Sequence, residues 1–493
     1  MTSLTLITRP VRPRVRTFDV FDTLIARKCI EPGRVFMQVE ARMGRPGFAV
    51  ERVLAERAVA GAPHTLADIY DQLAATGGLT RALRDALMQA EIDVELENVT
   101  PVAESLSLVR DGDIAVSDMY LPREVINAML KKAGLDKHLA LVLSCDGKKT
   151  GRIWPKLLEQ FEIDSHLGDN AESDVQRARE SGIVAEHFVS TTPDFVERWL
   201  VGADARDLGE VTRMARLATW SPDPVMRELQ LLQTRLNFPL MVLSTILLLR
   251  HVERNGIRNV LFCSRDCNLW IELFQVFRKH LGVDVDACYF HTSREARVRP
   301  SAGYLEYVRR CLGDKKSLVV DIAGTGWSLS HLFEALGETA PVYLLHRLSL
   351  VGYTGFEFAQ QVEPPASILD NSDTMPMYNN TFLEMLNYAA HPQVMDVLFE
   401  EDQPVPVFKT DRLPDQVAGY IDAQRGAFLT AVKLLDAHFL RETLEMSDAK
   451  LTAAISELYR HVNDAGLLRT VYAMHRKEEP KTRASLMMKL ARA

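Results

Sequence analysis

The chain has 493 residues, which is enough for two or three domains of ordinary size. Its residues are 47% hydrophobic and 25% charged, which is typical of soluble globular proteins. The net charge of −8 argues against a general nucleic-acid-binding protein, because such proteins are usually basic.

The targeting signals of the chain are weak. The N-terminal segment is basic but has no apolar core long enough for a secretory signal peptide. The longest apolar run, Phe238–Leu249, is shorter than the roughly 20 residues that a membrane-spanning helix needs. We therefore predict a buried helix at this run and a cytoplasmic protein.

The first half of the chain alternates predicted strands and helices. A short apolar strand near residues 15–18 ends in acidic residues, and apolar spacings of three and four predict helices over residues 32–98. Strand-like runs separated by helical stretches follow at residues 113–118, 139–144 and 165–169. This alternation predicts a parallel sheet. The pattern resets near residue 195, where we place a domain boundary.

The second half begins with predicted helices over about residues 208–255. Four strand-like runs then begin at Asn259, Asp286, Ser317 and Pro341. From about residue 411 the chain is predicted to be helical to its end. The predicted fold class is therefore α/β, with two Rossmann-like parallel-sheet domains, residues 1–195 and 196–410, followed by C-terminal helices over residues 411–493.

Polar residues of the first domain gather where its predicted strands end, which is where parallel sheets bind ligands. They are Asp19, Asp22 and Thr23; Ser117 and Asp118; Lys148 or Lys149; and Asp169 and Asp174. Carboxylates this close together raise one another's pKa unless a cation separates them, and hard oxygen ligands suit Mg²⁺. A hydroxyl and a lysine can hold phosphate oxygens, and one carboxylate can act as a nucleophile.

These residues lie in four motifs whose order resembles that of the haloacid-dehalogenase-like phosphohydrolase superfamily. DVFDT resembles the first motif, VSD the second, GKKTG the third and GDNAESD the fourth. The resemblance implies that Asp19 is the nucleophile, forms an aspartyl-phosphate and binds Mg²⁺ together with Asp169, supported by Asp174. It also implies a helical cap over the site at about residues 30–100.

The same resemblance assigns the substrate contacts of the first domain. Ser117 would bind the phosphoryl group, with Thr23 and Asp118 beside it, and Lys148 would neutralise its charge. The superfamily's phosphatases carry a second aspartate two places after the nucleophile, as the general acid and base. Here Phe21 holds that place, so its backbone carbonyl can still bind the metal but the proton donor is missing. Either Asp22 or a cap residue replaces the donor, or Asp22 only caps the turn.

A second polar cluster follows the strand SLVVD. Its acid is Asp321, and a loop rich in glycine and small residues comes next, Gly324, Thr325, Gly326, Trp327 and Ser328. Backbone N–H groups at a helix N-terminus can cradle a phosphate, and the alternative is a plain tight turn. The stretch resembles the phosphoribosyl-diphosphate-binding loop of type I phosphoribosyltransferases. That resemblance implies that Asp321 binds the ribose hydroxyls and the loop binds the 5-phosphate, although Val320 replaces the family's first acid.

Other strand ends of the second domain carry further candidates. Ser264, Arg265 and Asp266 stand where the family's diphosphate-binding loop would fall, and arginines 294, 297 and 299 follow the next strand. Arginine pairs with phosphate oxygens in a bidentate way. We favour a functional role for Arg265 and Arg294, and a solvated surface charge is the alternative for each arginine. Glu384 and His391 belong either to ordinary core and turn or to an acceptor site.

Together the two halves resemble fused phosphatase–phosphoribosyltransferase proteins that place ribofuranose on bacterial surface polysaccharides. The resemblance implies transfer of 5-phosphoribose from phosphoribosyl diphosphate to a glycan acceptor, followed by removal of the 5-phosphate. The first alternative is a stand-alone Mg²⁺-dependent phosphohydrolase with a non-catalytic second domain. The second is a non-catalytic sensor, in which Phe21 marks a lost activity.

The C-terminal segment Met474–Ala493 places Arg and Lys beside Leu and Met at helical spacing. This pattern predicts an interfacial helix that makes peripheral contact with a partner or an anionic membrane. A terminal helix packed on its own domain is the alternative.

Overall fold

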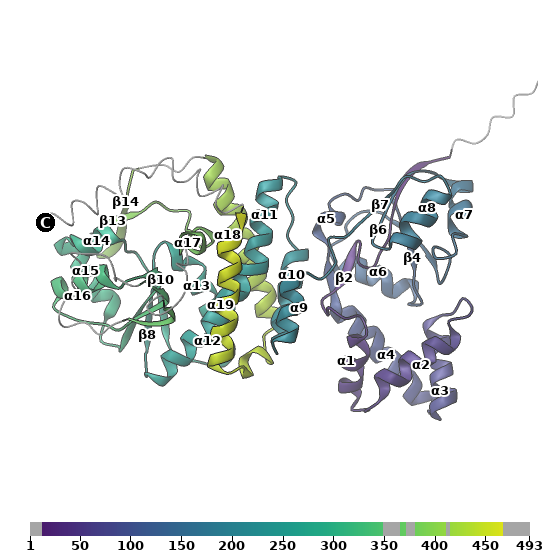
Figure 1. The fold of residues 1–493 in the computed structure, drawn as a ribbon, viewed down its shortest axis with the longest axis horizontal. Helices are drawn as coiled ribbons and strands as arrows, with labels where there is room; N and C mark the ends of the chain where they lie inside the picture. The colour runs from purple at the N-terminus through teal and green to yellow at the C-terminus, as the bar shows by residue number, and fades with distance from the viewer. Residues whose placement is uncertain (1–11, 349–364, 371–379, 411–414, 467–493) are drawn as a thin grey trace, which may run out of the picture. The chain divides into compact units, whose positions relative to one another are not determined.

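The computed structural model describes residues 12–348, 365–370, 380–410 and 415–466 (Figure 1). The chain forms two units. The first contains Met1–Phe195 with Leu217–Trp220, and the second contains Val196–Arg216 with Ser221–Ala493. The short segment Leu217–Trp220 therefore groups with the first unit, although it follows the start of the second in the sequence. Each unit is described by itself below.

The sheet of the first unit has five parallel strands in the order β5-β4-β1-β6-β7. Its strands are β1 Arg14–Phe18, β4 Ile114–Asp118, β5 Ala140–Ser144, β6 Glu162–Gly168 and β7 Ala185–His187. The predicted α/β fold class is confirmed, and β7 is an additional edge strand. Because β1 lies at the centre, between β4 and β6, the residues that follow it have neighbours from both sides.

Both faces of this sheet are buried, as its apolar strands predict. Successive side chains of a strand point to opposite faces, so Val116 joins one core and Ala115 the other. Helices and a π-helical turn connect the strands: α5 Ala103–Leu106, α6 Arg123–Lys132, α7 Ile153–Gln160, η1 Ala171–Gln176 and α8 Arg177–Glu180. The short connections leave the carboxyl ends of β1, β4, β5 and β6 at one edge.

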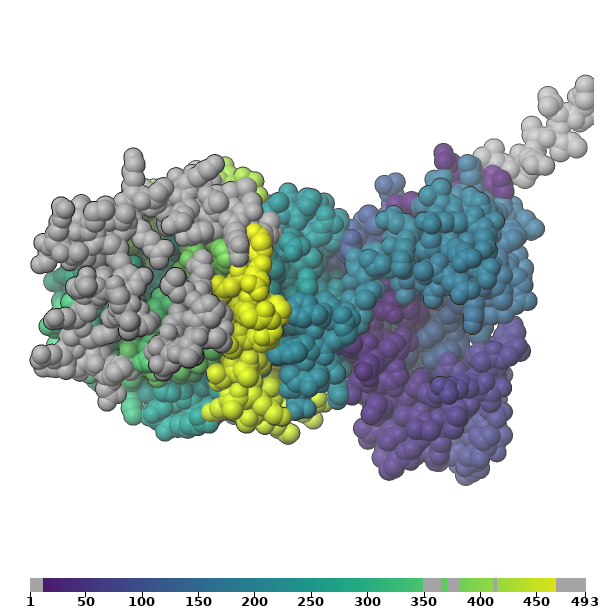
Figure 2. Space-filling model, in the orientation of Figure 1, coloured from purple at the N-terminus to yellow at the C-terminus, as the bar shows by residue number. Residues whose placement is uncertain are grey.

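The insert between β1 and β4 is helical, as its apolar spacing predicts. Its helices are α1 Arg34–Met43, α2 Phe48–Val59, α3 Leu66–Gly77 and α4 Arg81–Asn98. A two-stranded antiparallel stem, β2 Ile25–Arg27 and β3 Val99–Pro101, joins them to the sheet. The insert forms a lobe of its own within the first unit, purple in Figure 2. Its core contains a fully buried ion pair, in which Arg52 Nε donates to Glu91 at 2.7 Å.

The second unit contains another five-stranded parallel sheet, in the order β12-β11-β10-β8-β9. Its strands are β8 Asn259–Cys263, β9 Asp286–Phe290, β10 Ser317–Gly324, β11 Val342–Arg347 and β12 Ala366–Asp370. The four predicted strand-like runs are confirmed. The sequence pattern missed β12 and an antiparallel hairpin, β13 Val394–Glu400 and β14 Gln403–Phe408.

Helices cover both faces of the second sheet: α12 and α13 share a core with one face, and α14, α15 and α16 with the other. The helices of this unit before its C-terminal region are α9 Phe195–Gly202, α10 Arg206–Leu217, α11 Pro224–Leu232, α12 Phe238–Arg254, α13 Trp270–Leu281, α14 Arg294–Val298, α15 Ala302–Leu312, α16 Trp327–Leu336 and α17 Asn380–Leu386, with short turns η2 Gln233–Asn237 and η3 Asp266–Asn268. The predicted buried helix is α12, in which every residue from Phe238 to Leu249 is buried. The continuous helical stretch Pro224–Arg254, which contains α12, is long and apolar enough to cross a membrane, but 89% of its most apolar 18-residue window is buried inside the structure.

The C-terminal helices complete the core of the second unit instead of forming a separate region. They are α18 Asp415–Ala437, η4 Thr443–Glu445 and α19 Asp448–Asp464. Phe428 and Leu458 share one apolar core with α12, and α19 runs alongside α12 in Figure 1. The physical reason is that α12 is apolar on all sides and must be covered on each of them. The predicted interfacial segment Met474–Ala493 lies outside the described residues.

Candidate functional site

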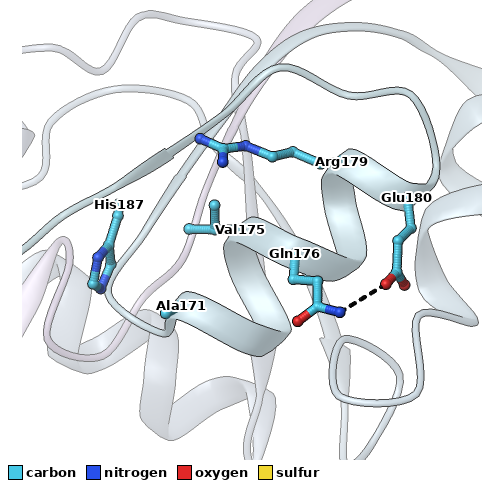
Figure 3. A pocket seen from close by; sticks show the side chains of 6 residues that line it. All are labelled: Ala171, Val175, Gln176, Arg179, Glu180 and His187. Carbon is cyan, nitrogen blue, oxygen red and sulfur yellow. Dashed lines mark hydrogen bonds between the residues drawn. The ribbon is translucent and has the colours of Figure 1, made fainter.

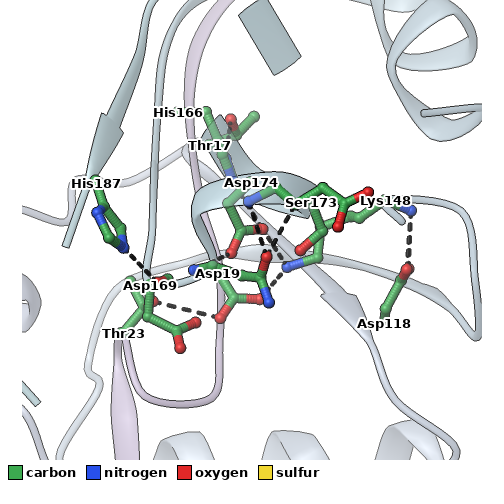
Figure 4. Close-up of polar contacts among 12 residues, drawn as sticks. Thr17, Asp19, Thr23, Asp118, Lys148, His166, Asp169, Ser173, Asp174 and His187 are labelled. Carbon is green, nitrogen blue, oxygen red and sulfur yellow. Dashed lines mark hydrogen bonds and ion pairs between the residues drawn. The ribbon is translucent and has the colours of Figure 1, made fainter. Parts of the chain in front are cut away.

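Asp19 lies directly after the central strand of the first sheet and is only 5% exposed. Its backbone N–H continues the ladder by donating to the carbonyl of Leu167 at 2.8 Å. The chain then turns sharply through Asp22, whose φ of 53° lies in the left-handed region. This turn places Thr23 beside Asp19, and the Thr23 hydroxyl donates to Asp19 Oδ2 at 3.3 Å (Figure 4). One oxygen of the candidate nucleophile is thus held by its own turn.

Lys148 provides the positive charge of this site, and the structure decides between the two adjacent lysines. Lys148 is 3% exposed, and its Nζ contacts Asp19 Oδ1 and donates to Asp174 Oδ1 at 2.6 Å, whereas Lys149 is exposed. Burial by itself would lower the Lys148 pKa, but the charges of Asp19 and Asp174 outweigh burial and raise the pKa above its ordinary value. Lys148 is therefore a charged bridge between two carboxylates.

Three carboxylates meet at the edge of the sheet. Asp19, Asp169 and Asp174 each offer an oxygen, and these oxygens lie within 4.8 Å of one another. Burial, and then the charges of the neighbouring aspartates, raise the pKa of Asp169 to about 8. Burial also raises the pKa of Asp19 to about 6, although Lys148 opposes the shift. Protonation relieves the repulsion among these carboxylates, and a hard divalent cation can relieve it as well. The three carboxylates therefore fit a divalent cation.

The serine and aspartate at the end of β4 have different surroundings. Ser117 is 2% exposed. Asp118 accepts hydrogen bonds from the backbone N–H groups of Lys148, at 2.9 Å, and Lys149, at 3.1 Å, and its other oxygen contacts the Ser144 hydroxyl. Both of its oxygens therefore hold the loop that carries Lys148, and the predicted contact of Asp118 with substrate stays a prediction.

Phe21 and Asp22 form the turn after Asp19, where the phosphatases of the superfamily carry their proton donor. The Phe21 ring packs against the guanidinium of Arg27, with 4.9 Å between the ring centroid and Cζ, and Arg27 in turn pairs with Glu95. The Asp22 carbonyl accepts a hydrogen bond from the Thr191 hydroxyl at 2.6 Å. The Asp22 carboxylate also contributes to the raised pKa of Asp169, so it lies near the carboxylate cluster. Its position is compatible with a proton donor and with a turn cap.

Sequence reasoning missed His166 and Thr17, which lie beneath the carboxylates on β6 and β1. His166 is 1% exposed, its Nε2 lies 3.3 Å from Asp174 Oδ1, and its Nδ1 lies 2.9 Å from the Thr17 hydroxyl. Burial would raise the Asp174 pKa, but the hydrogen bond from His166 and the charge of Lys148 lower it to about 2. The available signal was a threonine two places before Asp19 and a histidine three places before Asp169, in strands that also carry charged residues.

Gly168 gives Asp174 the space that it occupies. A Cβ at residue 168 would lie 2.5 Å from the Asp174 Cβ and 2.6 Å from its Oδ2. We expect Gly168→Ala to displace Asp174 and lower the free energy of unfolding by about 1–3 kcal/mol. Chemical denaturation measures this, with Gly33→Ala as the control, because Gly33 has φ −62° and no atom within 4 Å of its added Cβ. Equal stability of the two variants would contradict the close contact.

The raised carboxyl pKa values predict how the stability of the metal-free protein depends on pH. Asp169 and Asp19 have pKa values of about 8 and about 6 when folded and an ordinary value of 3.8. Between about pH 4 and pH 8 the folded state therefore binds more protons than the unfolded state, so stability falls as pH rises. Asp174 has a lowered pKa, and its contribution is lost only below this window.

A divalent cation should cancel this pH dependence, because it favours the charged carboxylates. We expect MgCl₂ to raise the melting temperature more at about pH 8 than at about pH 5, as measured by differential scanning fluorimetry. Asp169→Asn should show a smaller increase at the higher pH. The same effect of MgCl₂ at both pH values, in both proteins, would show that the carboxylates do not bind the cation.

An open cavity of about 620 Å³ borders η1 (Figure 3). Its lining comes from one face of η1 and α8 and from β7: Ala171, Val175, Gln176, Arg179, Glu180 and His187. The guanidinium of Arg179 is engaged by the carbonyl of Ala185 at 2.7 Å, and the imidazole of His187 by the carbonyl of Asp169 at 2.7 Å. The carboxylates that form the site therefore lie outside this lining.

The second unit brings together a different cluster around Asp321 on β10. The Arg297 guanidinium donates to Asp321 Oδ2 at 3.2 and 3.3 Å, to the Thr292 hydroxyl at 2.9 Å and to the Ser328 hydroxyl at 3.4 Å. Burial raises the Asp321 pKa, and the charge of Arg297 opposes this. Arg294, which the sequence favours as a diphosphate ligand, is exposed, and its charge also lowers the pKa of Asp321, so it lies near this cluster; Arg297 is the buried partner.

The residues after β8 lie beside this cluster. The Ser264 hydroxyl donates to the carbonyl of Thr292 at 2.7 Å, and so ties the end of β8 to the end of β9. The Arg265 guanidinium lies over the Tyr388 ring, with 4.7 Å between Cζ and the ring centroid. Burial, and then the charge of Glu384, raise the pKa of Asp266 well above its ordinary value. Glu384 therefore lies near Asp266, next to the carboxyl edge of the sheet.

The glycine-rich stretch is a very short turn. Gly324 ends β10 and Trp327 begins α16, so that Thr325 and Gly326 alone connect them. Gly326 has φ 79°, a conformation that favours glycine, and the Thr325 hydroxyl accepts a hydrogen bond from the Trp327 N–H at 3.2 Å. This tight turn is also a helix N-terminus, and such a terminus can bind phosphate.

Two further candidates from the sequence are Arg299 and His391. Arg299 is exposed. The His391 Nε2 lies 2.7 Å from the Tyr289 hydroxyl, and its Nδ1 lies 2.8 Å from the carbonyl of Pro392. His391 is therefore anchored in the turn beside β9.

The fold and sites together define a class: an α/β protein of two parallel-sheet units, each with charged residues gathered at its carboxyl edge. No family model and no curated protein matches this chain. Its function is therefore inferred from the residues of these two edges.

Proposed function

We propose that the first unit is a Mg²⁺-dependent phosphohydrolase with Asp19 as the nucleophile. The observation that carries this proposal is the buried bridge of Lys148 between Asp19 and Asp174, beside Asp169. A charged lysine next to a carboxylate at a strand end can hold a phosphate whose phosphorus faces that carboxylate. Mg²⁺, held by the three aspartates and the Phe21 carbonyl, would add positive charge beside the phosphate.

The reaction has two steps. A carboxylate oxygen of Asp19 attacks phosphorus, the bond from phosphorus to the ester oxygen breaks, and an aspartyl-phosphate forms. The leaving oxygen takes a proton from Asp22 or from a residue of the helical insert. Water then attacks phosphorus and gives its proton back to that same group, the bond to Asp19 breaks, and inorganic phosphate leaves. Lys148 balances the phosphoryl charge, Ser117 donates to a phosphoryl oxygen, and Asp118 holds the Lys148 loop.

We propose that the second unit transfers 5-phosphoribose from phosphoribosyl diphosphate. Its support is that Asp321, Arg297 and Asp266 come from different segments to one edge of the sheet, beside the Gly326 turn. In this step the bond between the anomeric carbon and the diphosphate oxygen breaks. The anomeric carbon bonds to an acceptor hydroxyl, whose proton is released. Asp321 would bind the ribose hydroxyls, the turn the 5-phosphate, and Arg265 and Arg294 the diphosphate.

The two activities together make a bifunctional ribofuranosylation enzyme that adds pentose as its 5-phosphate and then removes the phosphate. We propose a glycan acceptor and a cytoplasmic location, with peripheral membrane contact through the C-terminal segment. A stand-alone phosphohydrolase is the second candidate. One observation favours it: Asp321, the acid expected to bind the ribose hydroxyls, already forms an ion pair with Arg297.

The test uses phosphoribosyl diphosphate, MgCl₂ and extracted glycan acceptors, with mass spectrometry of the products. We expect added pentose from the wild type, and Mg²⁺-dependent phosphate release from p-nitrophenyl phosphate. Phosphate release without binding of phosphoribosyl diphosphate would establish the second candidate. If the protein neither binds phosphoribosyl diphosphate nor releases phosphate, both enzyme functions are wrong and the non-catalytic sensor is supported.

A further inference from the structure

A chain of hydrogen bonds runs beneath the carboxylates of the first unit, across strands β1 and β6 (Figure 4). It begins at the Thr17 hydroxyl, 2.9 Å from His166 Nδ1, and continues from His166 Nε2 to Asp174 Oδ1 at 3.3 Å. All three residues are 1% exposed. The chain continues through Lys148 to Asp19, so Thr17 and His166 are connected to the candidate nucleophile through Asp174 and Lys148.

The neighbours of the His166 imidazole decide which of its two ring nitrogens carries the proton. The Asp174 carboxylate only accepts hydrogen bonds, so the proton lies on His166 Nε2. In the neutral ring Nδ1 is then an acceptor. The Thr17 hydroxyl, 2.9 Å away, can donate its single proton to Nδ1 or to the Ser165 carbonyl at 3.1 Å, and Nδ1 is the nearer acceptor. The ring is held in this orientation by the edge of Trp154, with 4.7 Å between the centroids. The strand register places Thr17 directly beside His166, so the pair is fixed by the backbone.

Asp174 is held from three directions. Its Oδ1 accepts from His166 and from Lys148 Nζ, at 3.3 and 2.6 Å, and its Oδ2 accepts from the Asn170 backbone N–H at 3.0 Å. Lys148 and Asn170 both belong to loops at the edge of the sheet. His166 and Thr17 instead belong to central strands. The contact with His166 therefore ties the Asp174 carboxylate to the most rigid part of the unit.

We infer that His166 and Thr17 are positioning residues, which orient Asp174 so that it can hold Lys148 and contribute to the cation site. The inference rests on the proposed phosphohydrolase function. Neither residue touches a reacting atom. A side chain that orients a metal-site carboxylate by a hydrogen bond typically affects metal affinity or activity by about 10- to 100-fold.

Three substitutions separate this role from simple packing. His166→Phe keeps an aromatic ring against Trp154 but removes the donor to Asp174. His166→Gln keeps an amide N–H that can reach Asp174. Thr17→Val keeps the shape of the side chain and removes the hydroxyl that orients the imidazole. His138→Phe is the matched control, because His138 is exposed and precedes β5.

Mg²⁺ affinity is measured by isothermal titration calorimetry with MgCl₂ alone, and kcat is measured with p-nitrophenyl phosphate. We expect His166→Phe to weaken Mg²⁺ binding and lower kcat by about 10- to 100-fold, and Thr17→Val to have a smaller effect in the same direction. His166→Gln should restore most of both quantities. The His138→Phe control should match the wild type.

A packing role would give a different result. His166→Phe and His166→Gln would then change the melting temperature while leaving Mg²⁺ affinity and kcat at wild-type values, which would overturn the inference. If His166→Phe does not fold, wild-type affinity and kcat in Thr17→Val would overturn it as well. A wild-type protein that neither binds Mg²⁺ nor releases phosphate would instead refute the proposed function, and the inference with it.

Discussion

Replacing Asp19 with asparagine is expected to lower phosphoester hydrolysis by on the order of 10³-fold or more. The amide has nearly the shape of the carboxylate but cannot act as the nucleophile, so no aspartyl-phosphate forms. The substitution also removes one of the three carboxylates that meet at the edge of the sheet. These losses act on the chemical step itself, which is why we expect this effect to be among the largest.

The fold should survive this substitution. Lys148 keeps its 2.6 Å contact with Asp174, so its buried charge remains paired. The Asp19 carboxylate is destabilised by burial and by the charge of Asp174, and a neutral amide relieves both. We therefore expect the melting temperature of the metal-free Asp19→Asn protein to equal or exceed that of the wild type.

Initial rates of phosphate release from p-nitrophenyl phosphate measure the effect. The matched control is Asp164→Asn, because Asp164 is a half-exposed aspartate on β6 that pairs with Arg14. An aspartyl-phosphate survives an acid quench and reacts with hydroxylamine to give a hydroxamate. This treatment should detect the phosphorylated wild type and fail with Asp19→Asn. Near-wild-type rates in Asp19→Asn would rule out Asp19 as the nucleophile, whatever the stability of the variant.

Replacing Asp321 with alanine is expected to lower pentose transfer by about 10- to 100-fold while phosphoester hydrolysis stays at the wild-type rate. A charge-assisted hydrogen bond to a ribose hydroxyl is worth about 1.5–3 kcal/mol, which corresponds to a loss of this size. The two chemistries should separate because Asp321 and Asp19 belong to different units.

The structure adds a complication to this experiment, because Arg297 pairs with Asp321 and is buried. Alanine would leave that guanidinium without its carboxylate, at a cost in stability. Asp321→Asn keeps an oxygen that accepts from Arg297 and removes only the charge, so it should lose transfer with less change in melting temperature. Asp314→Ala, at an exposed position of the second unit, is the matched control.

Mass spectrometry of the acceptor distinguishes the two proposed activities. Asp19→Asn should accumulate phosphopentosyl product, because transfer continues and dephosphorylation does not. Asp321→Ala should give little product of either kind. Unphosphorylated pentose on the acceptor from Asp19→Asn would contradict the order of reactions that we propose.

Much of this protein follows from its sequence alone. The alternation of apolar strands and amphipathic helices predicted both parallel sheets, because strand and helix periodicities are local properties. Asp19, Asp169 and Asp174 were found for a related reason. Asp19 and Asp169 each follow a strand directly and Asp174 comes soon after, and parallel strands bring their carboxyl ends to one edge.

Tertiary structure decided what depends on side-chain direction and on contacts between distant segments. Lys148 is buried and Lys149 exposed, although the two are adjacent, because only one side chain can point into the site. Arg297 is buried and donates hydrogen bonds to Asp321, whereas Arg294, three residues earlier, is exposed, because the side chain at 297 faces β10. His166 joins Thr17 and Asp174 through the register of two strands that are distant in sequence. These contacts come from packing, which residue spacing along the chain does not encode.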